Sequence, residues 1–244
     1  MKKAILILLF SQFCIAQHGI IWQKTLGGNQ IDGFSSCIVG VDFGFLVGGT
    51  SNSGIDGDKN QVSRGSTDPW LIKFSENGLI QWQKTIGGSG SDALNQIIND
   101  ENGYFLACTS SSNISGEKTE NRRGLSDYWI IRINNIGNII SQKTIGGDRN
   151  DVLTSLVKTA NGLLIGGFSD SAISGEKTEN RRGVIGENDF WILNIDDDFN
   201  ILWQRTFGGS LNDRLYNIIP TLDGGFLLAG DSNSSISADK TEAN

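Results

Sequence analysis

The feature that most constrains the fold is a repeat with a period close to 60 residues. Gly-Gly pairs follow a WQKT-like phrase and begin at Gly27, Gly87, Gly146 and Gly208, at spacings of 60, 59 and 62 residues. An aspartate follows each pair with the same spacings, at Asp32, Asp92, Asp151 and Asp213. A second set of aspartates, each two residues before a tryptophan, lies at Asp68, Asp127 and Asp189. Such a period indicates one repeated supersecondary unit, as in propellers and solenoids.

One unit divides into four expected β-strands, named a, b, c and d. They cover residues 93–100, 104–111, 127–134 and 138–145. A turn at Gly103 joins a to b, a long polar segment (the b–c loop) joins b to c, and a turn at Gly137 joins c to d. In strand c, Trp129, Ile131 and Ile133 alternate with Ile130 and Arg132, which is typical of a strand. No segment of the unit has the period of a helix.

We therefore predict an all-β chain, a β-propeller of four-stranded antiparallel blades. The blades are expected at 32–86, 92–145 and 151–207, with a partial blade at 213–244 and a strand of a preceding blade at 20–26. The propeller is then incomplete, either an open arc or, as we favour, a fragment of a longer protein. The c–d turns should need a positive φ at Gly78, Gly137 and Asn200, because Gly and Asn tolerate it best.

The N-terminus has the pattern of an export signal. Lys2 and Lys3 precede the apolar run 4–10, and small residues favour cleavage after Ala16, giving a signal peptide at 1–16. Lipid attachment at Cys14 is the less favoured alternative, because the bulky Phe13 precedes it. The run is too short to span a bilayer. We expect an exported, extracellular or cell-surface monomer without a transmembrane segment.

The composition excludes several kinds of chemistry. A net charge of -7 without a basic stripe argues against a nucleic-acid partner. His18 is the only histidine, so a catalytic Ser-His-Asp or Cys-His arrangement has no base. Residues 56–60 resemble half of a calcium loop, but Gln61 stands where glycine is required. We predict no catalytic residue, metal or cofactor, and expect Cys37 and Cys108 to be buried hydrophobes.

Two roles remain open for the repeated aspartates. Because they recur in every unit, we expect Asp32, Asp92, Asp151, Asp213, Asp68, Asp127 and Asp189 to be structural, accepting backbone N–H bonds before strands a and c. A glycan hydrolase needs only two carboxylates, so that class of enzyme is the alternative. Strand d carries a tryptophan in three of its four copies, at Trp22, Trp82 and Trp203, and Ser141 in the remaining one; these tryptophans are expected to fill space between blades.

The b–c loop is the strongest candidate for binding. The phrase ISGEKTENRRG occurs at 114–124 and 173–183, and ISADKTEAN at 236–244. In an antiparallel meander these loops share one edge with the d–a connections, and loops on a repeated scaffold often bind ligands. The expected binding residues are Lys59, Arg64, Lys118, Arg122, Arg123, Lys177, Arg181 and Arg182. The competing interpretation is a solvated face whose Glu and Arg side chains pair with one another.

The phrases WQKTIGG, NGYFLAC, SGEKTENRRG, SDYWIIRI and TLDGGFLLAG resemble a known repeat type. They look like the W-x-K-T-x-G-G, D-G-G-[FY], S-G-[DE]-K and D-[YF]-W repeats of secreted Bacteroidota proteins, over nearly all of residues 20–244. The resemblance implies propeller-like repeats and type IX secretion, although the sorting tail of those proteins is not found here. From the repeated b–c loop we predict a secreted, non-enzymatic scaffold that binds a surface glycan or a cell-envelope protein. A glycan hydrolase and a fragment without independent activity are the alternatives.

Overall fold

The computed structural model describes residue 20 and residues 22–243 of the chain. The expected signal peptide at 1–16, with Cys14, and the single histidine His18 lie outside the described residues. Among the described residues there is no helix with the length and apolarity needed to cross a bilayer.

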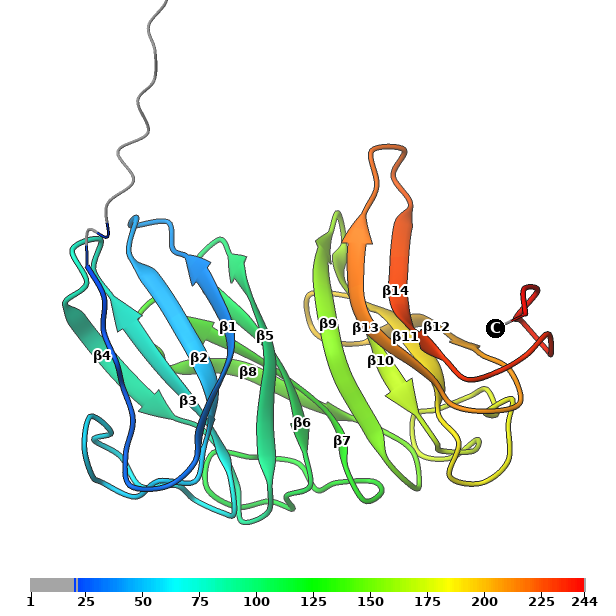
Figure 1. The fold of residues 1–244 in the computed structure, drawn as a ribbon, viewed down its shortest axis with the longest axis horizontal. Helices are drawn as coiled ribbons and strands as arrows, with labels where there is room; N and C mark the ends of the chain where they lie inside the picture. Colours follow the sequence, from blue (N-terminus) through cyan, green and yellow to red (C-terminus); the bar gives the residue numbers. More distant parts are fainter. Residues whose placement is uncertain (1–19, 21, 244) are drawn as a thin grey trace, which may run out of the picture.

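The described residues form three four-stranded antiparallel sheets and a two-stranded one (Figure 1). The first sheet contains β1 (Asp32–Val39), β2 (Phe45–Ser51), β3 (Asp68–Phe74) and β4 (Ile80–Thr85). The second contains β5 (Asp92–Asp100), β6 (Gly103–Ser110), β7 (Asp127–Asn134) and β8 (Ile139–Ile145). The third contains β9 (Asp151–Thr159), β10 (Gly162–Ser169), β11 (Asp189–Ile195) and β12 (Ile201–Phe207), followed by the pair β13 (Asp213–Pro220) and β14 (Phe226–Ser232). The all-β class and the four-stranded antiparallel unit are confirmed.

The N-terminal segment differs from the prediction. Residues 22–28 belong to no strand, so the expected strand at 20–26 is wrong. A strand requires a neighbour for its backbone hydrogen bonds, and no described strand pairs with this segment. It packs through side chains instead: the Trp22 ring centroid lies 5.9 Å from those of Phe45 and Phe74, and Leu26 contacts the same cluster.

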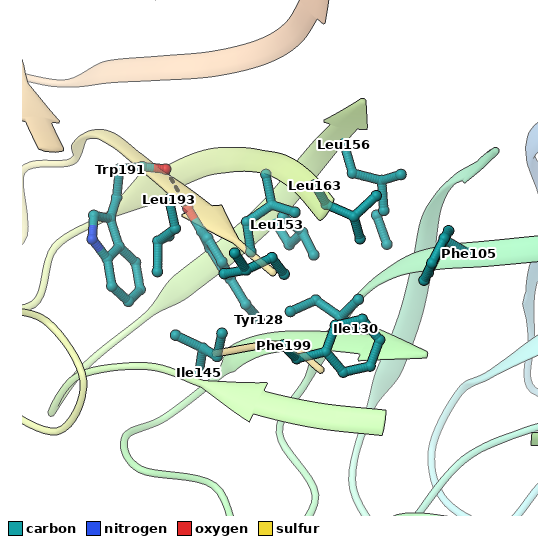
Figure 2. Close-up of a cluster of buried hydrophobic side chains, with 13 residues drawn as sticks. Phe105, Tyr128, Ile130, Ile145, Leu153, Leu156, Leu163, Trp191, Leu193 and Phe199 are labelled. Atoms are coloured by element: carbon teal, nitrogen blue, oxygen red, sulfur yellow. Dashed lines mark hydrogen bonds between the residues drawn. The ribbon is translucent and has the colours of Figure 1, made fainter. Parts of the chain in front are cut away.

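The hydrophobic cores lie between successive sheets. β5 packs on the first sheet, β9 on the second and β13 on the third. On β7, Trp129, Ile131 and Ile133 join a cluster shared with the first sheet, whereas Ile130 faces the cluster shared with the third. Figure 2 shows the latter cluster, in which the Tyr128 hydroxyl donates to the Trp191 carbonyl at 2.9 Å. Both faces of the second sheet are therefore buried, which explains why strand c is apolar on both sides.

The three turns between strands c and d have positive φ at the same position, which is glycine in two of them and phenylalanine in the third. Positive φ occurs at Gly78 (76°), Gly137 (78°) and Phe199 (64°), so the expectation for Asn200 is wrong by one position. A bulky residue at positive φ is strained, and here burial of the side chain offsets the cost: Phe199 is 2% exposed, with its ring 6.1 Å from Phe105.

Two different elements supply the aromatic ring that packs at this position: the strand d position before a sheet, or the c–d turn of the sheet itself. Trp22 lies against Gly78 and Trp82 lies against Gly137, so a tryptophan before one sheet meets a glycine in the next. At the following junction Ser141 replaces the tryptophan and Phe199 replaces the glycine. Trp82 therefore fills space between two sheets, Trp22 packs on the first sheet alone, and Phe199 compensates for the missing tryptophan at Ser141.

The two cysteines that the structure describes differ in environment. Cys108 is fully buried, and burial raises the pKa of its thiol. Cys37 is exposed on the edge strand β1, so the expectation that it is buried is wrong. In the later units strand a packs on the preceding sheet, but no described sheet precedes the first one, so this face of β1 and Cys37 are left uncovered.

Candidate functional site

The b–c loops and the Gly-Gly connections share one edge, which we name the loop edge (Figure 1). The loops span 52–67, 111–126, 170–188 and the described residues from 233. Each is bonded to the connection that precedes its own sheet. Glu117 N–H donates to the Gly87 carbonyl and Glu176 N–H donates to the Gly146 carbonyl, both at 2.9 Å. The loops are thus tied to the sheet junctions by backbone contacts.

Three of the lysines expected on this surface are buried. Lys59, Lys118 and Lys177 are 2%, 1% and 1% exposed, so the prediction that they are presented to a ligand is wrong. Lys177 Nζ donates to Thr206 Oγ1 at 2.7 Å and lies 5.0 Å from the Trp191 ring centroid. The loop folds back over its own strand c, and the long side chain reaches inward along the tryptophan.

Each buried lysine lies in the field of two repeat aspartates. Burial lowers the pKa of Lys177 to about 8, and the carboxylates of Asp151 and Asp189 oppose that shift. Lys118 is placed in the same way relative to Asp92 and Asp127, and its pKa is also lowered by burial to about 8. The two aspartate sets and the loop lysines therefore form one buried electrostatic cluster in each sheet, with two carboxylates to one ammonium group.

The aspartates that begin strand a hold the Gly-Gly connection. Asp92 Oδ2 accepts the Gly88 N–H at 2.6 Å and the Ser112 hydroxyl at 2.8 Å. The same glycine N–H bond forms at Asp32, Asp151 and Asp213, with lengths of 2.6 to 2.7 Å. Burial raises the pKa of Asp151 to about 6. These carboxylates close the turn between consecutive sheets.

The aspartates that begin strand c hold the end of the b–c loop. Asp127 Oδ2 accepts the Arg123 N–H at 2.6 Å, and Asp189 Oδ2 accepts the Arg182 N–H at 2.5 Å; Asp68 bonds to Arg64 in the same way. Burial raises the pKa of Asp68 and Asp189 to about 6 and also raises that of Asp127. Six of the seven repeat acids are buried, all except Asp32. These six side chains are out of reach of a polysaccharide.

Where a Gly-Gly pair follows a described sheet, its first glycine leaves room for a carboxylate of that sheet. A Cβ on Gly87 would lie 1.8 Å from Asp68 Oδ1, and a Cβ on Gly146 would lie 1.9 Å from Asp127 Oδ1. At Gly27 the nearest atom is Asp32 Oδ2, at 3.3 Å. The Gly-Gly motif is therefore required where one sheet follows another.

Arginines of the loops pair with acids of the next loop. Arg64 Nη2 lies 2.7 Å from Glu117, Arg123 Nε lies 2.9 Å from Glu176, and Arg182 Nε lies 2.8 Å from Asp239. The other two predicted arginines contact backbone: Arg122 donates to the Leu125 carbonyl at 3.2 Å and Arg181 to the Asp170 carbonyl at 3.3 Å. Much of the charge of the predicted surface is thus used to join neighbouring loops.

A row of exposed isoleucines is a repeated apolar feature of the loop edge. Each stands four residues before the loop lysine, where the repeated phrase begins, and the preceding residue varies between the copies. Their exposed fractions are 60 to 67%, at Ile55, Ile114, Ile173 and Ile236. We did not predict this row from sequence, although the recurrence of one aliphatic residue in four polar loops was visible there.

Comparisons with known proteins give no family. No protein-family model matches the chain, and the comparison with curated proteins found no match. Among the described residues, no group of three or more His, Cys, Asp or Glu side chains is arranged to hold a metal ion. The geometry of the loop edge therefore carries the functional proposal.

Proposed function

We propose that the chain is a non-enzymatic binding scaffold whose loop edge docks a protein of the cell envelope. The observation that carries this proposal is the row of four exposed isoleucines at one loop position. Single exposed apolar residues are ordinary, but the same residue at the same exposed position in every loop is a repeated apolar surface. Aliphatic side chains suit an apolar protein surface, whereas sugars are typically held by aromatic rings and hydrogen bonds.

The loop edge is also preorganised for binding. The buried lysines, the repeat aspartates and the pairs between arginines and acids hold each loop against its sheet and its neighbour. A rigid surface loses less conformational entropy when it binds a partner. Binding by the isoleucines would add about 1.5–3 kcal/mol for each side chain that becomes fully buried.

The proposal includes a propeller-like arrangement and export. The support for blades is that successive four-stranded sheets pack face to face, each new strand a lying on the preceding sheet. The support for export is the pattern of residues 1–16. Small-angle X-ray scattering of the chain without residues 1–16 should fit a curved arc of sheets. A profile that fits only a straight rod would contradict the propeller.

Docking is tested by replacing two isoleucines of the row. The double variant Ile114→Ser and Ile173→Ser should bind an immobilised outer-envelope fraction about 100-fold more weakly than the native chain, as measured by biolayer interferometry. The matched control is Ile136→Ser, because Ile136 is 62% exposed in a c–d turn at the opposite edge. It should leave binding unchanged.

Treating the envelope fraction with protease separates the two kinds of partner. A protein partner predicts that binding is lost after this treatment. Binding that survives the protease, or that is equally strong in the isoleucine double variant, would refute docking of a protein through this row. Survival of binding would point to the glycan partner instead.

A further inference from the structure

A polar cleft lies at the junction of the first two sheets. Its volume is about 330 Å³, and its lining includes Gln61 and Arg64 of one b–c loop, Lys84 of β4, Glu117 of the next loop, and Gly137 and Asn138 of a c–d turn. The exposed isoleucines of the loop edge are not among its lining residues.

The shape of the cleft follows from a difference between junctions. Gly137 carries no side chain and lies against the Trp82 ring. At the next junction the same turn position is Phe199, whose buried side chain belongs to the cluster between the second and third sheets (Figure 2). At the first junction the Trp82 ring takes the place of that side chain, and Gly137 lets the turn lie close to the stem of Lys84, which lines the cleft.

The charged residues at this junction also differ from those at the next two junctions. At the second junction Glu120 bonds the Thr144 N–H at 3.0 Å and pairs with Lys143 at 3.1 Å. At the third, Glu179 bonds the Thr206 N–H at 2.7 Å and pairs with Arg205 at 3.2 Å.

Gln61 takes the place of these glutamates at the first junction. Its Oε1 accepts the Thr85 N–H at 2.7 Å, so the amide nitrogen stands where a second carboxylate oxygen would be. Lys84, the counterpart of Lys143, lies 3.3 Å from the neutral Asn138 Oδ1 and forms no ion pair with a described carboxylate. Arg64 and Lys84 thus face one acid, Glu117, and the cleft has one excess positive charge.

We propose that this cleft binds a single oxyanion group, the carboxylate or sulfate of a small acidic molecule or sugar. Lys84 Nζ and the Gln61 amide nitrogen are its donors. Arg64 donates to Glu117 through Nε and Nη2, so these two nitrogens are not available to the ligand. Arg64 contributes positive electrostatic potential instead. Hydrogen bonds to charged groups are stronger than neutral ones, and a partly enclosed site strengthens them further. This proposal goes beyond the docking of a protein and does not depend on it.

The test is a titration of the full chain, labelled with nitrogen-15, followed by NMR. The ligands are D-glucuronate, D-glucose 6-sulfate, inorganic sulfate and, as the neutral control, D-glucose. The three anions should shift the amide signals of Gln61, Gly137 and Asn138 in a saturable manner, and D-glucose should not. If inorganic sulfate binds as tightly as the sugar sulfate, the cleft recognises the oxyanion alone, which also supports the proposal.

Two variants test the residues, and one serves as the matched control. Q61E installs the acid that the other two junctions already contain, so the fold tolerates it, and it should weaken binding about tenfold or more. K84Q should do the same, whereas K143Q at the neighbouring junction should change the affinity less than twofold. Failure of every anion to shift these signals at about 50 mM would overturn the proposal. Equal affinity in Q61E and the native chain would overturn it as well.

Discussion

Replacing Gly87 with alanine is expected to disrupt the junction between the first two sheets and to lower the free energy of unfolding by more than about 3 kcal/mol. The added Cβ would lie 1.8 Å from Asp68 Oδ1, and Asp68 is fully buried. The carboxylate cannot move aside without losing the N–H bonds that it accepts from Arg64 and Gly65. Overpacking and a buried charge without hydrogen bonds therefore act together.

Chemical denaturation followed by tryptophan fluorescence measures this effect. Gly27→Ala is the matched control, because the same motif position has its nearest neighbour at 3.3 Å, so this variant should cost much less. Adding Asp68→Ala to Gly87→Ala should recover part of the loss, since it removes the clashing atom. If Gly87→Ala and Gly27→Ala are equally stable, the close approach of Asp68 does not explain the Gly-Gly motif.

Replacing Lys177 with methionine should cost about 3–5 kcal/mol, because it leaves two buried carboxylates without their cation. Methionine keeps the length of the side chain and its packing along Trp191, so the loss reports mainly the charge. Arg205→Gln is the control. Arg205 also pairs with an acid, but its side chain is 61% exposed, and an exposed pair is worth about 1 kcal/mol or less.

The pH dependence identifies the groups involved. Burial raises the pKa of Asp151 and Asp189 from 3.8 to about 6, so the native state binds more protons than the unfolded state in that range. Their contribution to stability is present below pH 3.8 and is lost as the pH rises through about 6. Lys177 has the opposite sign. Its pKa falls from 10.5 to about 8, so its contribution is present above pH 10.5 and is lost as the pH falls through about 8.

The methionine variant should therefore show two changes in urea denaturation. Its deficit relative to the native chain should shrink below pH 6, where Asp151 and Asp189 become protonated. The rise in stability between pH 8 and 10.5 that Lys177 contributes should be absent. A deficit that is constant from pH 4 to 10 would show that packing, and not charge, accounts for the loss.

The periodic part of the fold could be predicted from sequence because each strand repeats with its own pattern. The alternation in residues 127–134 places Trp129 and Ile130 on opposite faces, and both faces prove to be buried between sheets. Segment 20–26 was misassigned because its sequence matches strand d although the described chain supplies no strand to pair with it. The residue with positive φ in the last c–d turn was predicted one position too late, because residue preference favours Asn200 whereas the hydrogen bonds of the turn place Phe199 where the other turns have glycine.

The loop edge was harder to predict because sequence shows which residues recur but not which way they point. Lys177 and Ile173 stand in the same polar phrase, four residues apart. The charged side chain is buried and the aliphatic one is exposed, the reverse of the usual preference. Two aspartates, from the starts of strands a and c, interact electrostatically with the buried lysine. Only the folded chain brings these three residues together.

Near-identical repeats risk pairing with the wrong neighbour during folding, and the exchange of aromatic residues between junctions counters that risk. Trp82 meets Gly137, whereas Ser141 is matched by Phe199. A second sheet that skipped its proper neighbour and met the wrong turn would bring two large rings together at one junction and leave an unfilled gap at another. The aromatic residue thus comes from strand d at one junction and from the c–d turn at the next, so sheets joined in the wrong order would pack poorly although their loops are almost the same.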